Sequence, residues 1–143
     1  MAAKSTRRSQ HQALRLRRAL IAALGASGLV LLVLVARLLG AVEVPGTLFW
    51  LFAAPWLAGA WGFVLFVVTG RNLALADPSM TLAQILWAAT APICLFPFVP
   101  ELTEPSYLAL LVVGSFGAFR LGAGHYVATN AVLAVAMGLA FLV

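Results

Sequence analysis

The sequence predicts an all-α polytopic membrane protein, and three observations lead to this prediction. Of the 143 residues, 64% are hydrophobic and only 9% are charged, whereas soluble domains carry about 25% charged residues. The apolar residues gather in five stretches separated by short polar gaps. Eight of the nine lysine and arginine residues fall in alternate gaps. We therefore expect a transmembrane helical bundle with five spans.

The chain begins with a polar segment, residues 1–18, which we expect to lie in the cytoplasm. It carries six of the nine basic residues, namely Lys4, Arg7, Arg8, Arg15, Arg17 and Arg18. Basic residues beside a span are attracted to the anionic lipid of the inner leaflet, by about 1 kcal/mol each. Because they flank a span and form no folded patch, they indicate a lipid partner and no nucleic acid. Residues Gln12–Arg18 can extend the first helix into the cytoplasm.

The first span is predicted over residues 19–39. Its uncharged run, residues 19–36, gives a helix of about 27 Å, which is enough to cross the bilayer core with slight adjustment. The apolar region of a signal peptide is shorter, at about 7–15 residues, and it precedes a cleavage site of small residues. Arg37-Leu38-Leu39-Gly40 is a poor cleavage site, so we expect an uncleaved anchor.

Four more spans are predicted, over residues 47–69, 81–99, 106–121 and 126–143. Pro55 lies within the second span, and Pro92 and Pro97 lie within the third. Membrane helices tolerate proline where neighbours or water satisfy the freed carbonyls, and we expect the third span to be kinked. The gaps are short, so residues 19–143 form one helical domain, with no room for a folded domain on either side.

The basic residues also orient this bundle. With a cytoplasmic N-terminus, eight lysine and arginine residues lie inside and only Arg37 lies outside. Lysine and arginine accumulate in cytoplasmic loops, so this is the orientation that we expect. Five spans then place Val143 on the outer side of the membrane.

Ionisable side chains within spans are functional candidates by default, and the predicted spans contain almost none. Three of the four acids, Glu43, Glu101 and Glu104, fall in outer loops. Cys94 is the only cysteine, and neither histidine lies within a span. The sequence therefore predicts no catalytic residue, disulfide, metal site or cofactor. Arg37 ends the first span, and its guanidinium is expected to reach the headgroups.

A few polar and small residues do lie within spans. We expect Thr90, Thr129 and Asn130 to hydrogen-bond between helices, typically for about 0.6 kcal/mol each. Ala58 and Gly62 are small residues four positions apart. That spacing lets neighbouring helices approach closely.

The most distinctive segment is the inner connection between the second and third spans, Gly70–Gln84. Two signals in it compete for the start of the third helix. Asp77 can cap this helix, with Pro78 as its first residue. Alternatively, Thr81 and Gln84 can form a T-x-x-Q capping box.

This connection resembles a loop in the N-terminal membrane regions (MASE-type input domains) of bacterial GGDEF diguanylate cyclases, approximately N-L-x-x-x-D-P-S-L-T-L-P-Q. The matching strings are Gly70-Arg71-Asn72-Leu73 and Asp77-Pro78-Ser79-Met80-Thr81-Leu82-x-Gln84, and the stretch Phe116–Leu121 is also similar. The candidate motif residues are Arg71, Asn72, Asp77, Pro78, Ser79, Thr81 and Gln84. Arg71 can pair with a phosphate or with Asp77. The chain departs from the family at Ala83, where proline is expected, and at Ala74 and Ala76.

The resemblance implies a sensory or anchoring module of the bacterial inner membrane that serves cyclic di-GMP signalling. Such modules commonly have six spans, can form homodimers, and precede a cytoplasmic signalling domain, so a sixth span is expected beyond Val143. The chain contains no Gly-Gly turn, and Asp77 is its only acid on the inner side. A cyclase site needs carboxylates for two divalent metals, so these residues cannot make cyclic di-GMP.

A second reading is a free-standing small inner-membrane protein, either an accessory protein or a transporter subunit. Transporters usually combine broken helices with polar groups near the membrane midplane. Pro92 and Pro97 supply a break, but no charged residue accompanies them. The sequence favours the sensory module over this alternative.

Overall fold

A computed structural model describes residues 2–95, 99, 102, 107–108, 110–111 and 122–140. In this part of the chain every regular element is a helix, which confirms the all-α prediction for these residues. The elements are α1 (Ala2–Leu38), α2 (Gly46–Val68), the 3-10 helix η1 (Arg71–Ala74), α3 (Thr81–Leu95) and α5 (Ala123–Ala140).

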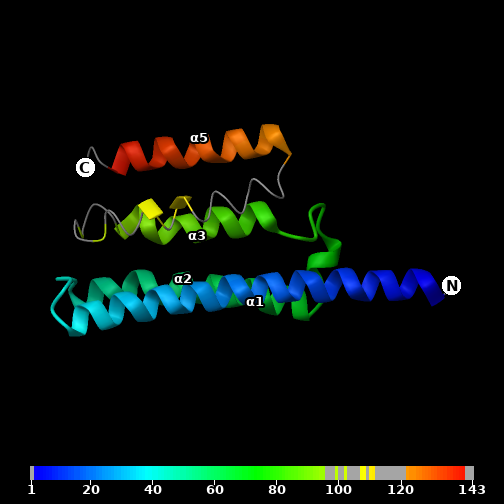
Figure 1. The fold of residues 1–143 in the computed structure, drawn as a ribbon, viewed down its shortest axis with the longest axis horizontal. Coiled ribbons are helices and arrows are strands. Elements are labelled where there is room, and N and C mark those ends of the chain that lie inside the picture. Colours follow the sequence, from blue (N-terminus) through cyan, green and yellow to red (C-terminus); the bar gives the residue numbers. More distant parts are fainter. Residues whose placement is uncertain are drawn as a thin grey trace.

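The four α-helices run along one axis, side by side, in the order α1, α2, α3, α5 (Figure 1). The α1–α2 connection lies at one end of the bundle. The α2–α3 connection lies at the opposite end, which we call the loop end (Figure 1). The first turns of α1 project beyond the loop end, so this helix is longer than the bundle that it packs against (Figure 1).

Two helices, Gln10–Leu38 and Gly46–Val68, are long and apolar enough to cross a membrane. A helix in the core of a soluble protein would bury such a surface. Here large apolar side chains point outward instead, as in Leu32 and Leu65, each 63% exposed. Apolar surface of this kind is favourable only in apolar surroundings, which indicates that the chain associates with a membrane.

The expected spans agree with the helices to different degrees. The first two spans end within one residue of α1 and α2, and Pro55 lies inside an unbroken α2. The third corresponds to α3, which contains Pro92 and is shorter than a bilayer crossing needs. The fifth corresponds to α5, although its residues 141–143 lie outside the described residues. Two spans of the expected five are therefore supported by length and hydropathy.

The fourth expected span, residues 106–121, lies almost entirely outside the described residues. The structure describes only Tyr107, Leu108, Leu110 and Leu111 within it. The expected kink at Pro97 and the similar stretch Phe116–Leu121 also lie outside that part of the chain.

Helix α1 is one continuous helix from the basic segment into the first span, as expected for Gln12–Arg18. The helix ends at Leu38, and the chain turns away from it at Gly40, where φ is +71°. The Gly40 amide donates to the Arg37 carbonyl at 3.1 Å, and the Ala41 amide donates to the Ala36 carbonyl at 2.9 Å. This pair of bonds is a Schellman motif, and it requires the left-handed conformation that glycine adopts without strain.

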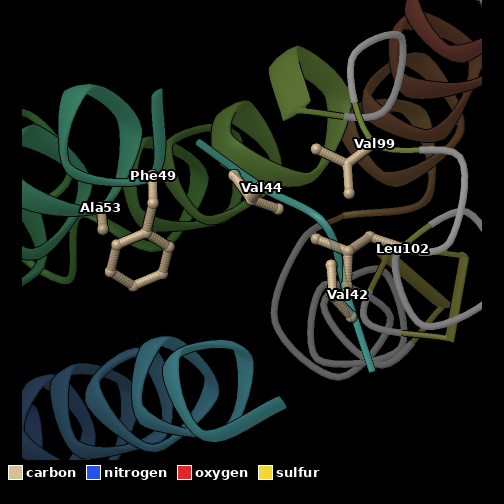
Figure 2. Close-up of a cluster of buried hydrophobic side chains, with 6 residues drawn as sticks. All are labelled: Val42, Val44, Phe49, Ala53, Val99 and Leu102. Atoms are coloured by element: carbon tan, nitrogen blue, oxygen red, sulfur yellow. The ribbon is translucent and has the colours of Figure 1, made fainter. Parts of the chain in front are cut away.

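The buried side chains form separate clusters along the bundle. At the α1–α2 connection the cluster comprises Val42, Val44, Phe49, Ala53, Val99 and Leu102 (Figure 2). Figure 2 shows Val42 beside Leu102, whereas Phe49 and Ala53 project from α2. Nearer the loop end, a second cluster comprises Ala19, Ala23, Val64, Val67 and Met80. This second cluster holds α1 against α2 directly beside the connection that carries the candidate motif.

Candidate functional site

The α2–α3 connection starts with a sharp turn at Gly70. Its φ is +72°, a left-handed conformation that glycine adopts readily. The Gly70 amide donates to the Val67 carbonyl at 3.1 Å, and the Leu73 amide donates to the Gly70 carbonyl at 3.1 Å. The chain therefore leaves α2 abruptly and enters η1, which brings Asn72 to the inside of the connection.

Asn72 is the centre of the loop end. Its side chain is fully buried, with 0% exposure. The Nδ2 group donates to the Pro78 carbonyl at 2.8 Å, which closes the connection on itself. The Oδ1 atom accepts a hydrogen bond from Gln12 Nε2 at 2.8 Å. A buried amide needs such partners because an unsatisfied polar group costs about 1–3 kcal/mol.

Gln12 extends these contacts to two helices. Its Nε2 also donates to the Val67 carbonyl, near the end of α2, at 2.9 Å. Its Oε1 accepts from Arg15 Nη1 at 3.2 Å and from Asn72 Nδ2 at 3.4 Å. We call the hydrogen-bonded group of Gln12, Arg15, Val67, Asn72 and Pro78 the junction. The junction joins α1, the end of α2 and the connection in one polar network.

Asp77 organises the start of α3. Its Oδ1 accepts hydrogen bonds from the Ser79 amide, at 2.9 Å, and from the Ser79 hydroxyl. Its Oδ2 accepts from the Thr81 amide at 3.2 Å. The hydroxyls of Ser79 and Thr81 also bond each other, at 2.9 Å. Asp77 therefore satisfies the first free amide of α3, that of Thr81, as a capping side chain does.

These bonds show how each of the two predicted starts of the third helix compares with the structure. Asp77 does cap α3, but the helix begins at Thr81, so Pro78 as its first residue is wrong. The Thr81–Gln84 capping box is also wrong. The Thr81 amide donates to Asp77, and the Gln84 amide bonds the Met80 carbonyl at 2.9 Å as part of the helix.

Charge reinforces the Asp77 cap. Partial burial by itself raises the pKa of Asp77, but the hydrogen bonds from Ser79 and Thr81 and the positive charge of Arg15 outweigh it. The pKa of this carboxyl therefore lies below its ordinary value. Arg15 belongs to α1, so the cap is linked electrostatically to the same helix that the junction binds.

Met80 lies between the Asp77 cap and the first residue of α3, Thr81. It is buried and has a φ of 52°, a left-handed conformation that costs a non-glycine residue about 1–2 kcal/mol. Its side chain packs in the cluster with Ala19, Ala23, Val64 and Val67. Packing against α1 and α2 offsets the backbone strain, and nothing in the sequence around Met80 signals this conformation.

The structure brings together most of the candidate motif residues. Five of them form the two bonded groups described above, namely Asn72, Asp77, Pro78, Ser79 and Thr81. Arg71 is exposed, and the cation that acts on Asp77 is Arg15. Gln84 is half-buried and contributes its backbone amide to α3. Gln12 and Arg15 could not be predicted as members of the site, because no local pattern in the sequence signals a contact between residues 60 positions apart.

Helices α2 and α3 are joined by a second polar contact, away from the loop end. Trp56 Nε1 donates to the Trp87 carbonyl at 3.0 Å, and Trp87 Nε1 donates to the Trp56 carbonyl, also at 3.0 Å. The Trp87 ring lies over Gly59, where an added Cβ would come within 2.1 Å of it. The close approach of helices therefore occurs at Gly59. At Gly62, the expected position, an added Cβ meets nothing within 4 Å.

The other polar residues bond locally. The Thr90, Thr129 and Asn130 side chains donate to carbonyls of their own helices, at 2.7, 2.7 and 2.9 Å, and among the described residues none of these bonds joins two helices. Arg37 Nε donates to the Val44 carbonyl at 2.6 Å, which anchors the α1–α2 connection. Over the described residues, no three His, Cys, Asp or Glu side chains lie where they could hold a metal ion.

No protein-family model, curated protein or solved structure matches this chain. The relation of residues 70–84 to the diguanylate cyclase input regions therefore stays a prediction that depends on the residues quoted for it.

Proposed function

We propose that this chain is a sensory or anchoring membrane module of a bacterial signalling protein, the input region of a diguanylate cyclase. In this proposal five spans cross the bacterial inner membrane, and the N-terminus and the loop end lie in the cytoplasm. The module forms a homodimer in a bilayer with an anionic inner leaflet. Its signal passes to a cytoplasmic domain that makes cyclic di-GMP, because the module itself lacks the metal-binding carboxylates for that reaction.

The junction is the observation that carries this proposal. The connection that resembles the family loop bonds to α1 through Gln12 and to its own Pro78 through Asn72. The basic segment of α1, the end of α2 and the connection therefore meet at one polar contact. A change of helix packing in the membrane would move this contact and with it the basic segment. That is the arrangement an input module needs to pass a signal to the cytoplasm.

A signal can shift the packing only if its ligand binds one arrangement better than the other. Over the described residues the polar side chains within the spans are bonded to their own helices or to a neighbouring helix. The proposal therefore places the signal among lipids or apolar ligands at the outward apolar surfaces of α1 and α2, where Leu32 and Leu65 are exposed.

Cyclic di-GMP in the cell that carries the gene tests the function. We expect Asn72→Leu to change its level, because the substitution removes the buried amide from the junction. Asn130→Leu is the matched control, because Asn130 lies away from the junction and its Nδ2 donates to the Tyr126 carbonyl of its own helix. An unchanged level in Asn72→Leu and in a gene deletion, with normal amounts of protein, would support the accessory or transporter alternative.

Topology has a separate test. Reporters active only in the cytoplasm should work at Ala74, in η1, and reporters active only outside should work at Glu43 and at Val143. A cytoplasmic signal at Val143 would reject five spans. A cytoplasmic signal at Glu43 would reject the membrane crossing of α1, and with it the whole proposal.

A further inference from the structure

We propose that the junction is a latch. When it opens, the basic segment of α1, residues 2–18, separates from the α2–α3 connection, while the helices remain packed within the membrane. This inference goes beyond the proposed function, and it holds whether the chain is a signalling module or an accessory protein.

One side chain makes the hydrogen bonds that residues 10–18 form across this boundary. The structure describes the side chains of this segment from Gln10 onward, and their hydrogen bonds to the rest of the chain all involve Gln12. They reach Val67 at 2.9 Å and Asn72 at 2.8 and 3.4 Å. The neighbouring Gln10 and His11 are exposed. A rotation of the Gln12 side chain therefore breaks all of these bonds together.

Each side of the boundary keeps its own structure after opening. Residues 2–18 belong to a continuous helix whose backbone bonds lie within it. The connection retains the bond from Asn72 Nδ2 to the Pro78 carbonyl and the cap that Asp77 makes to Thr81. Opening therefore leaves both sides folded. It bends α1 near residue 18, and it loses the Gln12 bonds together with the packing of Leu16 against the cluster that contains Val67 and Met80.

Water can reach the Gln12 bonds, whereas it cannot reach the contacts between helices inside the membrane. Gln12 lies seven positions before the uncharged run of the first span, and it is half-buried. Water can replace the bonds that Gln12 loses there. Water cannot replace the Trp56–Trp87 bonds or the apolar packing of Ala23 against Val64 inside a membrane. Opening therefore stays confined to the loop end.

Distances between two spin labels test the latch on the full chain in lipid nanodiscs. The labels go on His11→Cys in α1 and Leu73→Cys in η1, both exposed positions, with Cys94→Ala in the background. The unaltered junction should give mainly one short distance. Gln12→Ala should raise the ratio of long to short distances about tenfold, the effect of losing two ordinary hydrogen bonds. Gln12→Glu should act in the same direction, because it replaces the donating Nε2 with an acceptor.

Gln10→Ala and Gln10→Glu are the matched controls, and each should change the ratio by less than about twofold, as exposed substitutions do. Tryptophan emission should stay the same in every variant, because Trp56 and Trp87 remain packed. The latch is wrong if Gln12→Ala keeps the original distances. It is also wrong if the tryptophan emission shifts together with the distances, because the whole bundle would then have loosened.

Discussion

Gly59→Ala is the substitution for which the structure predicts the clearest effect on helix packing. An added Cβ would lie 2.1 Å from Trp87 Cε2 and 2.3 Å from Trp87 Nε1. Ordinary contact starts at 3.4 Å, so the indole has to move by about 1.3 Å. That movement separates Trp87 Nε1 from the Trp56 carbonyl, which now lies 3.0 Å away.

The size of the effect follows from these contacts. Overpacking typically costs about 1–3 kcal/mol, and each lost bond between membrane helices costs about 0.6 kcal/mol. Replacing a glycine in the middle of α2 returns up to about 1 kcal/mol. We therefore expect Gly59→Ala to lower the free energy of unfolding by about 1–3 kcal/mol.

Unfolding in mixed micelles with rising denaturing detergent, followed by tryptophan fluorescence, measures this change. Gly62→Ala is the matched control, because it lies in the same helix and an added Cβ meets nothing within 4 Å. It should leave stability unchanged or raise it. If Gly59→Ala and Gly62→Ala unfold alike, Trp87 does not pack on Gly59, and the α2–α3 contact is wrong.

Two further predictions concern the ends of helices. Gly40→Ala should lower the free energy of unfolding by about 1–2 kcal/mol, because φ is +71° there; the control Gly25→Ala, in open space within α1, should not destabilise the chain. Asp77→Ala should speed amide exchange at Thr81, for a loss of about 0.5–1 kcal/mol at an exposed cap. Since the pKa of Asp77 is lowered, its stabilising effect is present at neutral pH and is lost as the pH falls through that pKa. Acid should therefore lower the protection of the Thr81 amide, measured as its exchange rate relative to an unstructured peptide at the same pH, in the unaltered chain, and leave that protection unchanged in Asp77→Ala.

Helix positions could be predicted from the sequence wherever the chain carries strong local signals. Gly40 and Gly70 end α1 and α2 because their left-handed backbone suits glycine, and Asp77 caps α3 with its carboxylate. The start of α3 was harder to predict, because Asp77 and the Thr81–Gln84 pair are both good capping signals. Only the folded connection shows that Asp77 reaches the Thr81 amide.

Contacts between distant segments could not be predicted in the same way. Helix α2 is apolar on all sides, so its sequence does not show whether Gly59 or Gly62 faces a neighbour. Gln12 belongs to a basic segment, and the pattern of that segment indicates only that it flanks the first span. Its bond to Asn72 depends on how α1 packs on α2. The residues of the connection could therefore be predicted as a candidate site, whereas their partner on α1, Gln12, could not.

A double-mutant cycle on Gln12 and Asn72 tests most directly that the connection is bonded to α1. Gln12→Ala, Asn72→Ala and the double variant are compared by their free energies of unfolding. If the two side chains bond each other, the sum of the two single effects should exceed the effect of the double variant by about 1 kcal/mol, within the range for residues that share a hydrogen bond. The pair Gln10→Ala and Asn72→Ala should add within about 0.5 kcal/mol. Additive effects for Gln12 and Asn72 would contradict the junction, and the proposals built on it would fail.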